Sequence, residues 1–152
     1  ILAEALLNHG NRAFRYFAES SPASFNDNAD LRVIEPYVHG QFIEGADSPY
    51  AGRGHVHWLT GTASTVMVGC VEGILGLRPT PEGLAVSPAI PSEWNGFSMR
   101  KVFRGKVLNI TVDNAAHREG GVTGMTLNGV SHAVGLIREE ELLAENELLV
   151  VM

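Results

Sequence analysis

The chain has few of the features that mark disulfide-bonded, membrane-spanning or nucleic-acid-binding proteins. It contains a single cysteine, Cys70, so no disulfide can form within it, and we expect a reducing, cytoplasmic location. No apolar run approaches the roughly 18 residues that span a membrane. The 11 lysine and arginine residues are outnumbered by 17 aspartate and glutamate residues, and the net charge of −6 argues against a nucleic-acid partner.

The patterns of common catalytic and metal sites are also missing. There is no P-loop, no glycine-rich dinucleotide turn and no Ser-His-Asp signature. His39, His55 and His57 lie close in the sequence, but no further cysteine or histidine pattern supplies the remaining ligands of a metal site, so none is expected. Glu35 and Glu44 could form a carboxylate pair for sugar chemistry, yet their spacing fixes no geometry and neither is assigned as catalytic.

The first 19 residues have helical periodicity. The segment "ILAEALLNHGNRAFRYF" begins without a cap or an initiator methionine, so we expect the chain to be the C-terminal part of a larger protein. A break at "NHGN" predicts two helices, with Gly10 as a left-handed C-terminal residue and Asn11 as the next N-cap. Leu6, Phe14 and Phe17 are expected on buried faces.

Residues 20–59 are rich in loop-forming residues but also in aromatic ones, which favours loops that fold over another part of the molecule rather than disorder. Gln41 lies among these aromatic residues. Its amide can donate and accept hydrogen bonds at once, which suits sugar hydroxyls, although a loop-bracing role fits equally well. Residues 62–76 are apolar on nearly every side and predict a helix buried all round, as in the inner ring of an α-barrel.

The remainder of the chain predicts strands. The four prolines of "LRPTPEGLAVSPAIPSEW" exclude a helix there. Leu108, Ile110 and Val112 then alternate with polar residues, as in a half-buried strand. Asn128 and Gly129 suit the two-residue type I′ turn of a hairpin, and "ENELLVVM" can form a last strand. Helices therefore precede an antiparallel β-region, with the boundary between residues 77 and 91.

Thr60, Gly61 and Thr62 stand where the apolar helix should begin. Backbone N–H groups at a helix N-terminus lack partners within the helix, and the helix dipole adds a partial positive charge. Gly61 would let a ligand approach the backbone, and the threonine hydroxyls could donate to phosphate oxygens. These residues therefore form either a simple helix cap or an anion site.

Four motifs in order carry a resemblance to a known family: "EPYVHGQFIEG", "WLTGTA", "EGILGLRPTPEGLAVSPAIPSEWNGF" and "RKVFRGKVLNITV". They resemble the C-terminal part of the inverting glycoside phosphorylases of glycoside hydrolase family 94, which act on cellobiose, cellodextrins, chitobiose or β-1,2-oligoglucans. The resemblance implies that residues 1–77 are the last helices and loops of an (α/α)6 catalytic barrel. Residues 78–152 would then be a linker and a small antiparallel β-sandwich.

The resemblance also implies a reaction and its site. Phosphate attacks the anomeric carbon of a β-linked oligosaccharide with inversion, while one carboxylic acid protonates the leaving sugar. Thr60 and Gly61 match the pair that binds this phosphate, which leaves Thr62 as the helix cap, and Gln41 matches a glutamine that hydrogen-bonds the transferred sugar.

The catalytic Asp and a phosphate-binding His lie upstream of the matching region, so the chain alone is expected to be inactive. Inorganic phosphate is a substrate in this reaction, and no cofactor is implied. Family members commonly form homodimers, which makes a second copy of the chain a candidate partner.

The segments "HVHW" and "YVHGQ" depart from the usual text of the family beside the sugar subsites, and they bear on linkage specificity. A β-1,2 linkage and a β-1,4 linkage both remain open. Two other interpretations are a plain glycoside hydrolase and a non-catalytic carbohydrate-binding module built on the β-region with Trp94 and Phe97.

Overall fold

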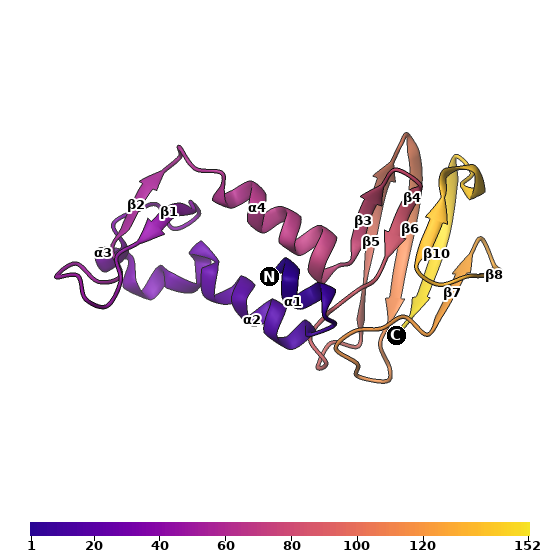
Figure 1. Cartoon of the computed structure of the whole chain (residues 1–152), viewed down its shortest axis with the longest axis horizontal. Coiled ribbons are helices and arrows are strands. Elements are labelled where there is room, and N and C mark those ends of the chain that lie inside the picture. The colour runs from indigo at the N-terminus through magenta and orange to yellow at the C-terminus, as the bar shows by residue number, and fades with distance from the viewer. The chain divides into compact units, whose positions relative to one another are not determined.

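A computed structural model describes all 152 residues, which form two compact units. One unit is Arg15–Val68, which contains mostly loops and short elements. The other combines Ile1–Phe14 with Gly69–Met152 and contains eight of the ten strands (Figure 1). We call the first the loop unit and the second the β unit.

The β unit contains two sheets. The five-stranded sheet has the order β5-β6-β10-β7-β8, formed by Gly96–Phe103, Lys106–Asp113, Glu145–Val151, Gly124–Leu127 and Val130–His132. The three-stranded sheet has the order β3-β4-β9, formed by Leu77–Thr80, Gly83–Val86 and Leu136–Arg138. Both sheets contribute fully buried side chains, among them Leu77, Leu84, Val86, Leu108, Ile110, Ile137, Leu148 and Val150.

The predicted strand features are confirmed. Leu108, Ile110 and Val112 are buried on β6, where they alternate with more exposed residues. The β7–β8 hairpin turns at Asn128 and Gly129, whose φ angles of 52° and 80° match a type I′ turn.

One strand pairing was predicted wrongly. The C-terminal strand β10 lies between β6 and β7, and it runs parallel to β6 with Glu145 opposite Val107. All other pairings are antiparallel. A short hairpin forces neighbouring strands to be antiparallel, whereas the long connection between β6 and β10 imposes no such direction.

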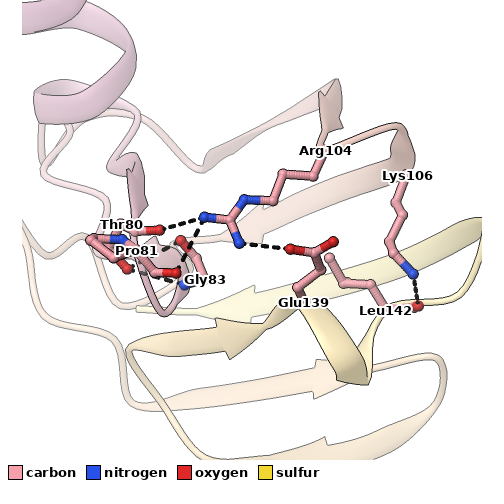
Figure 2. A network of polar contacts seen from close by, with 7 residues as sticks. All are labelled: Thr80, Pro81, Gly83, Arg104, Lys106, Glu139 and Leu142. Atoms are coloured by element: carbon pink, nitrogen blue, oxygen red, sulfur yellow. Dashed lines mark hydrogen bonds and ion pairs between the residues drawn. The ribbon is translucent and has the colours of Figure 1, made fainter.

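A polar network ties the two sheets together at one end (Figure 2). Arg104, in the turn between β5 and β6, donates hydrogen bonds to the carbonyls of Thr80 and Pro81 at distances of 3.0 and 3.3 Å. Its guanidinium also pairs with Glu139 at 2.7 Å, in the short helix η3 (Glu139–Glu141) that follows β9. One side chain therefore joins the β3–β4 turn, the β5–β6 turn and the segment after β9.

The N-terminal helices are α1 (Leu2–Leu6) and α2 (Gly10–Ser20). Two helices are present as predicted, but the left-handed residue between them is Asn8, with a φ of 61°, and α2 already begins at Gly10. A Cβ atom at Gly10 would collide with the carbonyls of Ile90 and Glu119, so this glycine allows close packing rather than a turn.

The predicted roles of two other N-terminal residues are also wrong. Asn11 lies inside α2 and is not its cap; its side-chain oxygen accepts a hydrogen bond from the backbone N–H of Ser92 at 2.9 Å. Leu6 is 52% exposed instead of buried. Phe14 and Phe17 are half-buried.

The predicted apolar helix is present as α4 (Thr62–Val68), continued by a π-helical segment, η2 (Gly69–Ile74). In η2, Gly69, Gly73 and Ile74 are buried, and α1 packs closely on the two glycines. Burial on all sides is wrong for α4, which has no buried residue and in which Met67 is 63% exposed. No helix in the structure has the length and hydrophobicity that crossing a bilayer requires.

Candidate functional site

The candidate site lies in the loop unit, where one hairpin brings two of the sequence motifs together. The unit contains η1 (Pro22–Asn28), α3 (Ala29–Arg32), β1 (Gly40–Ile43) and β2 (Gly54–His57). Strands β1 and β2 pair antiparallel, with Gly40 opposite His57. Gln41 is exposed on β1, and Thr60 follows shortly after β2.

Thr60 caps the helix that follows it. Its Oγ1 accepts a hydrogen bond from the backbone N–H of Thr62 at 3.1 Å and lies 2.8 Å from the Thr62 hydroxyl. The capping hydroxyl therefore belongs to Thr60, and the capping role expected of Thr62 is wrong. Only one proton can lie between two hydroxyl oxygens, so the second hydroxyl proton of this pair is free to reach a ligand.

Gly61 presents an open backbone at the start of α4. Its carbonyl accepts hydrogen bonds from the Ser64 hydroxyl at 2.8 Å and from the Thr65 hydroxyl and N–H at 3.0 Å. A Cβ atom built on Gly61 would meet only Ser64 Oγ within 4 Å, at 3.9 Å. The side of this residue on which a ligand could approach is therefore unobstructed.

A pocket of about 190 Å³ opens beside Thr60. Tyr37 and Trp58 pack edge to face in its wall, with their ring centroids 6.3 Å apart, and both remain largely exposed, at 72% and 65%. Exposed aromatic rings with a neighbouring hydroxyl are suited to sugars, whose faces are apolar and whose edges are polar. The pocket is lined by Tyr37, Val38, His39, Trp58, Thr60 and Ala63.

The carboxylates and imidazoles of this unit form two separate pairs. Glu35 Oε1 accepts a hydrogen bond from the Trp58 indole at 3.0 Å, and its Oε2 lies 3.1 Å from His57 Nδ1. Glu44 lies 2.9 Å from His55 Nε2, and the His55 ring stacks on Phe42. Glu35 and Glu44 thus contact different histidines.

The backbone around His57 is bent in an unusual way. Val56 and Trp58 have φ angles of 52° and 68°, in the left-handed region that bulky and β-branched side chains rarely adopt. This bend lies directly before Thr60. The segment directly before the candidate anion site is therefore strained.

Arg32 supports the segment that carries the pocket residues Val38 and His39. Its side chain is 5% exposed and donates hydrogen bonds to the carbonyls of Pro22 and Val38, at 3.2 and 2.6 Å. Burial lowers the pKa of the neighbouring His39 below its ordinary value of 6.5, and the Arg32 charge lowers that pKa further. Nothing in the sequence distinguishes Arg32 from a surface arginine, and the prediction missed it.

Comparison with known proteins divides the chain into two matches. Residues 1–76 match the model of the glycosyl hydrolase 94 superfamily catalytic domain, and residues 77–118 match that of the glycosyl hydrolase family 65 C-terminal domain.

Among similar proteins, an N,N'-diacetylchitobiose phosphorylase of Vibrio proteolyticus is 36% identical over 151 residues, 99% of this chain and 19% of that protein. A solabiose phosphorylase of Paenibacillus borealis is 30% identical over 129 residues, 85% of this chain and 17% of that protein. A cyclic β-(1,2)-glucan synthase of Rhizobium meliloti is 36% identical over 115 residues, 74% of this chain and 4% of that protein. The chain thus spans less than a fifth of the length of these relatives.

Proposed function

The chain belongs to the glycosyl hydrolase 94 superfamily, and on this basis we propose that it is part of an inverting glycoside phosphorylase. Such an enzyme is a glycosyltransferase that cleaves a β-linked gluco-oligosaccharide with inorganic phosphate and releases a sugar 1-phosphate. The names of the chitobiose and solabiose phosphorylases support this activity. They do not agree on one disaccharide, so the proposal extends to the class of substrate and not to the sugar or linkage.

The family membership also supports a proposed arrangement of domains. Residues 1–77 would complete an (α/α)6 catalytic barrel, and residues 78–152 would form a linker and a β-sandwich. The two family matches, which meet between residues 76 and 77, support this division. The partners are the oligosaccharide and phosphate, with a second copy of the chain in a homodimer, and the single cysteine supports a cytoplasmic location.

Thr60 and Gly61 are proposed to bind the attacking phosphate. The free hydroxyl proton of the Thr60–Thr62 pair, the open backbone of Gly61 and the positive end of α4 all favour an anion at this point. Gln41, exposed on β1, is proposed to hydrogen-bond the sugar that is transferred. The Thr60 geometry is the observation that carries the proposal.

In this mechanism the residues of the chain bind and orient the nucleophile. Phosphate forms the new bond to the anomeric carbon as the glycosidic bond breaks, and the leaving oxygen takes a proton from a carboxylic acid. That acid and a second phosphate ligand are expected from the remainder of the enzyme, so the chain alone is inactive. The phosphate is consumed as a substrate, and the reaction uses no cofactor.

The test is to replace Thr60 with Val in the full-length enzyme, which keeps the shape of the side chain and removes the hydroxyl. The KM for phosphate should rise by about 10- to 100-fold, because a hydrogen bond to a charged group contributes about 1.5–3 kcal/mol. Thr111→Val, the same change at an exposed position of β6 in the β unit, is the matched control and should leave this KM within about twofold. An unchanged KM in Thr60→Val excludes the phosphate assignment. Release of sugar from the wild type without phosphate would identify a hydrolase instead.

A further inference from the structure

Glu35 links the two chain segments that line the candidate pocket, residues 37–39 and residues 58–63. It directly precedes the segment that carries Tyr37 and His39, and its carboxylate contacts Trp58 in the segment that leads to Thr60. The indole N–H of Trp58 donates to Glu35 Oε1 at 3.0 Å, and His57 Nδ1 lies 3.1 Å from Oε2. One side chain therefore contacts two successive residues, His57 and Trp58, shortly before Thr60.

These two residues lie within the strained bend described above. Left-handed backbone at Val56 and Trp58 costs of order 1–3 kcal/mol per residue and persists only where the surroundings enforce it. His57 lies between the two left-handed residues, and the contacts of Glu35 reach both His57 and Trp58. Glu35 is thus placed to enforce the bend.

We propose that Glu35 is a positioning residue, whose carboxylate holds residues 56–58 in their bent conformation and thereby sets the place of Thr60 and Gly61. The proposal rests on the function given above, since it takes Thr60 and Gly61 as the phosphate ligands. It assigns Glu35 to the support of the nucleophile and not to bond breaking.

The contacts of Glu35 argue against an acid–base role. Oε1 already accepts the indole hydrogen bond, and Oε2 is enclosed and lies at ion-pair distance from His57, outside hydrogen-bond geometry. The hydrogen bond from Trp58 lowers the pKa of this carboxyl below its usual value of 4.5. It is therefore ionised at neutral pH and has no proton to donate to a leaving sugar.

The same hairpin contains a natural control. Glu44 contacts His55 at 2.9 Å with similar chemistry, but His55 pairs regularly with Phe42 and its backbone is not left-handed. Removing either carboxylate deletes one partner of a histidine. Only removal of Glu35 should release the bend before Thr60.

The experiment compares Glu35→Ala with Glu44→Ala in the full-length enzyme. Glu35→Ala should raise the KM for phosphate by about tenfold or more, since small displacements of positioned ligands cost up to about 100-fold. The kcat should change by less than about threefold, because phosphate at saturating concentration holds the segment in its bent conformation. The loss therefore appears in the KM for phosphate. Glu44→Ala should leave the phosphate KM within about twofold, and Glu35→Gln, whose amide oxygen can still accept the indole hydrogen bond, should be intermediate.

A second measurement does not depend on activity. Hydrogen exchange of the Thr62 amide, which donates to Thr60 Oγ1, reports whether the turn is held. It should be about tenfold faster in Glu35→Ala and unchanged in Glu44→Ala. If Glu35→Ala does not fold, Trp58→Phe removes the same hydrogen bond from the other side and should also speed this exchange.

Equal phosphate KM values and equal exchange rates in the two alanine variants would overturn the positioning role. An enzyme that releases sugar without phosphate would overturn the proposed function alone, because the exchange comparison would still test the role of Glu35.

Discussion

The β7–β8 hairpin and the β1–β2 segment of the loop unit differ in the residues that adopt left-handed backbone. In the β7–β8 hairpin the left-handed positions are occupied by Asn128 and Gly129, which adopt this conformation at little cost. In the loop unit they are occupied by Val33, Val56 and Trp58, whose side chains oppose it. The hairpin therefore turns with little strain, whereas the backbone at Val56 and Trp58 is strained close to the candidate phosphate site, as is common at functional sites.

The two tryptophans allow the units to be followed separately. Trp58 lies in the loop unit, and Trp94 packs edge to face on Phe14 within the β unit, with the ring centroids 5.2 Å apart. Trp58→Phe and Trp94→Phe each leave one reporter. Trp94 fluorescence in Trp58→Phe then reports unfolding of the β unit, and Trp58 fluorescence in Trp94→Phe reports unfolding of the loop unit.

The largest expected effect is in the β-unit core. Ile110 is 1% exposed on β6, so Ile110→Ala should lower the free energy of unfolding reported by Trp94 by about 2–5 kcal/mol, through lost burial and the cavity left behind. Thr111→Ala, on the exposed side of the same strand, should change it by less than about 0.5 kcal/mol. Urea titration of Trp94 fluorescence measures both, and equal effects would contradict the assigned strand faces.

An intermediate effect is expected when glycine and valine are exchanged at left-handed positions of the two units. A Cβ at Gly129 would meet no atom within 4 Å, so Gly129→Val adds the cost of left-handed backbone without a clash. It should lower the free energy of unfolding reported by Trp94 by about 1–2 kcal/mol. Val56→Gly should instead stabilise the loop unit by up to about 1 kcal/mol in the Trp58 transition, because relief of strain outweighs the added flexibility of the unfolded chain. Destabilisation by Val56→Gly would show that Val56 is not strained.

The smallest expected effect is a loss of stability of the loop unit in mild acid. Because burial lowers the pKa of His39, the unfolded chain binds a proton more readily than the folded loop unit. The resulting stability is fully present above pH 6.5 and is lost as the pH falls through the lower folded value. The free energy of unfolding reported by Trp58 should therefore decrease as the pH falls below 6.5. His39→Gln should remove this pH dependence.

The β unit should respond to acid at lower pH. A hydrogen bond from the Arg138 backbone lowers the pKa of Glu141 below 4.5, so this contribution is lost only below that pH. Simultaneous loss of both transitions near pH 6 would contradict the separation of the units.

Sequence patterns predicted the β unit better than the packing of the helices. Alternation around Ile110 and the Asn128–Gly129 pair each encode a local geometry, and both were read correctly. The role of Gly10 depends on carbonyls about 80 to 110 residues away, and the direction of β10 depends on its partner in the sheet. Neither can be read from periodicity.

In the candidate site, too, features encoded by neighbouring residues were predicted, and contacts between distant residues were not. The motifs around Gln41 and Thr60 were found from the sequence because each is continuous. The contact from Glu35 to Trp58 spans 23 residues and depends on how the segments around the β1–β2 hairpin meet, which the sequence does not state. Arg32 was missed for the same reason, since its partners are backbone carbonyls, which every residue has.

The position of β10 between β6 and β7 also orders the assembly of the β unit. The hairpins β5–β6 and β7–β8 close over a few residues and can form early, but β10 must enter between them after a much longer loop closes. Until it does, β6 and β7 each present an open edge to other chains. Pairing of β10 with both strands therefore covers two open edges at once and protects the folded β unit from edge-to-edge association.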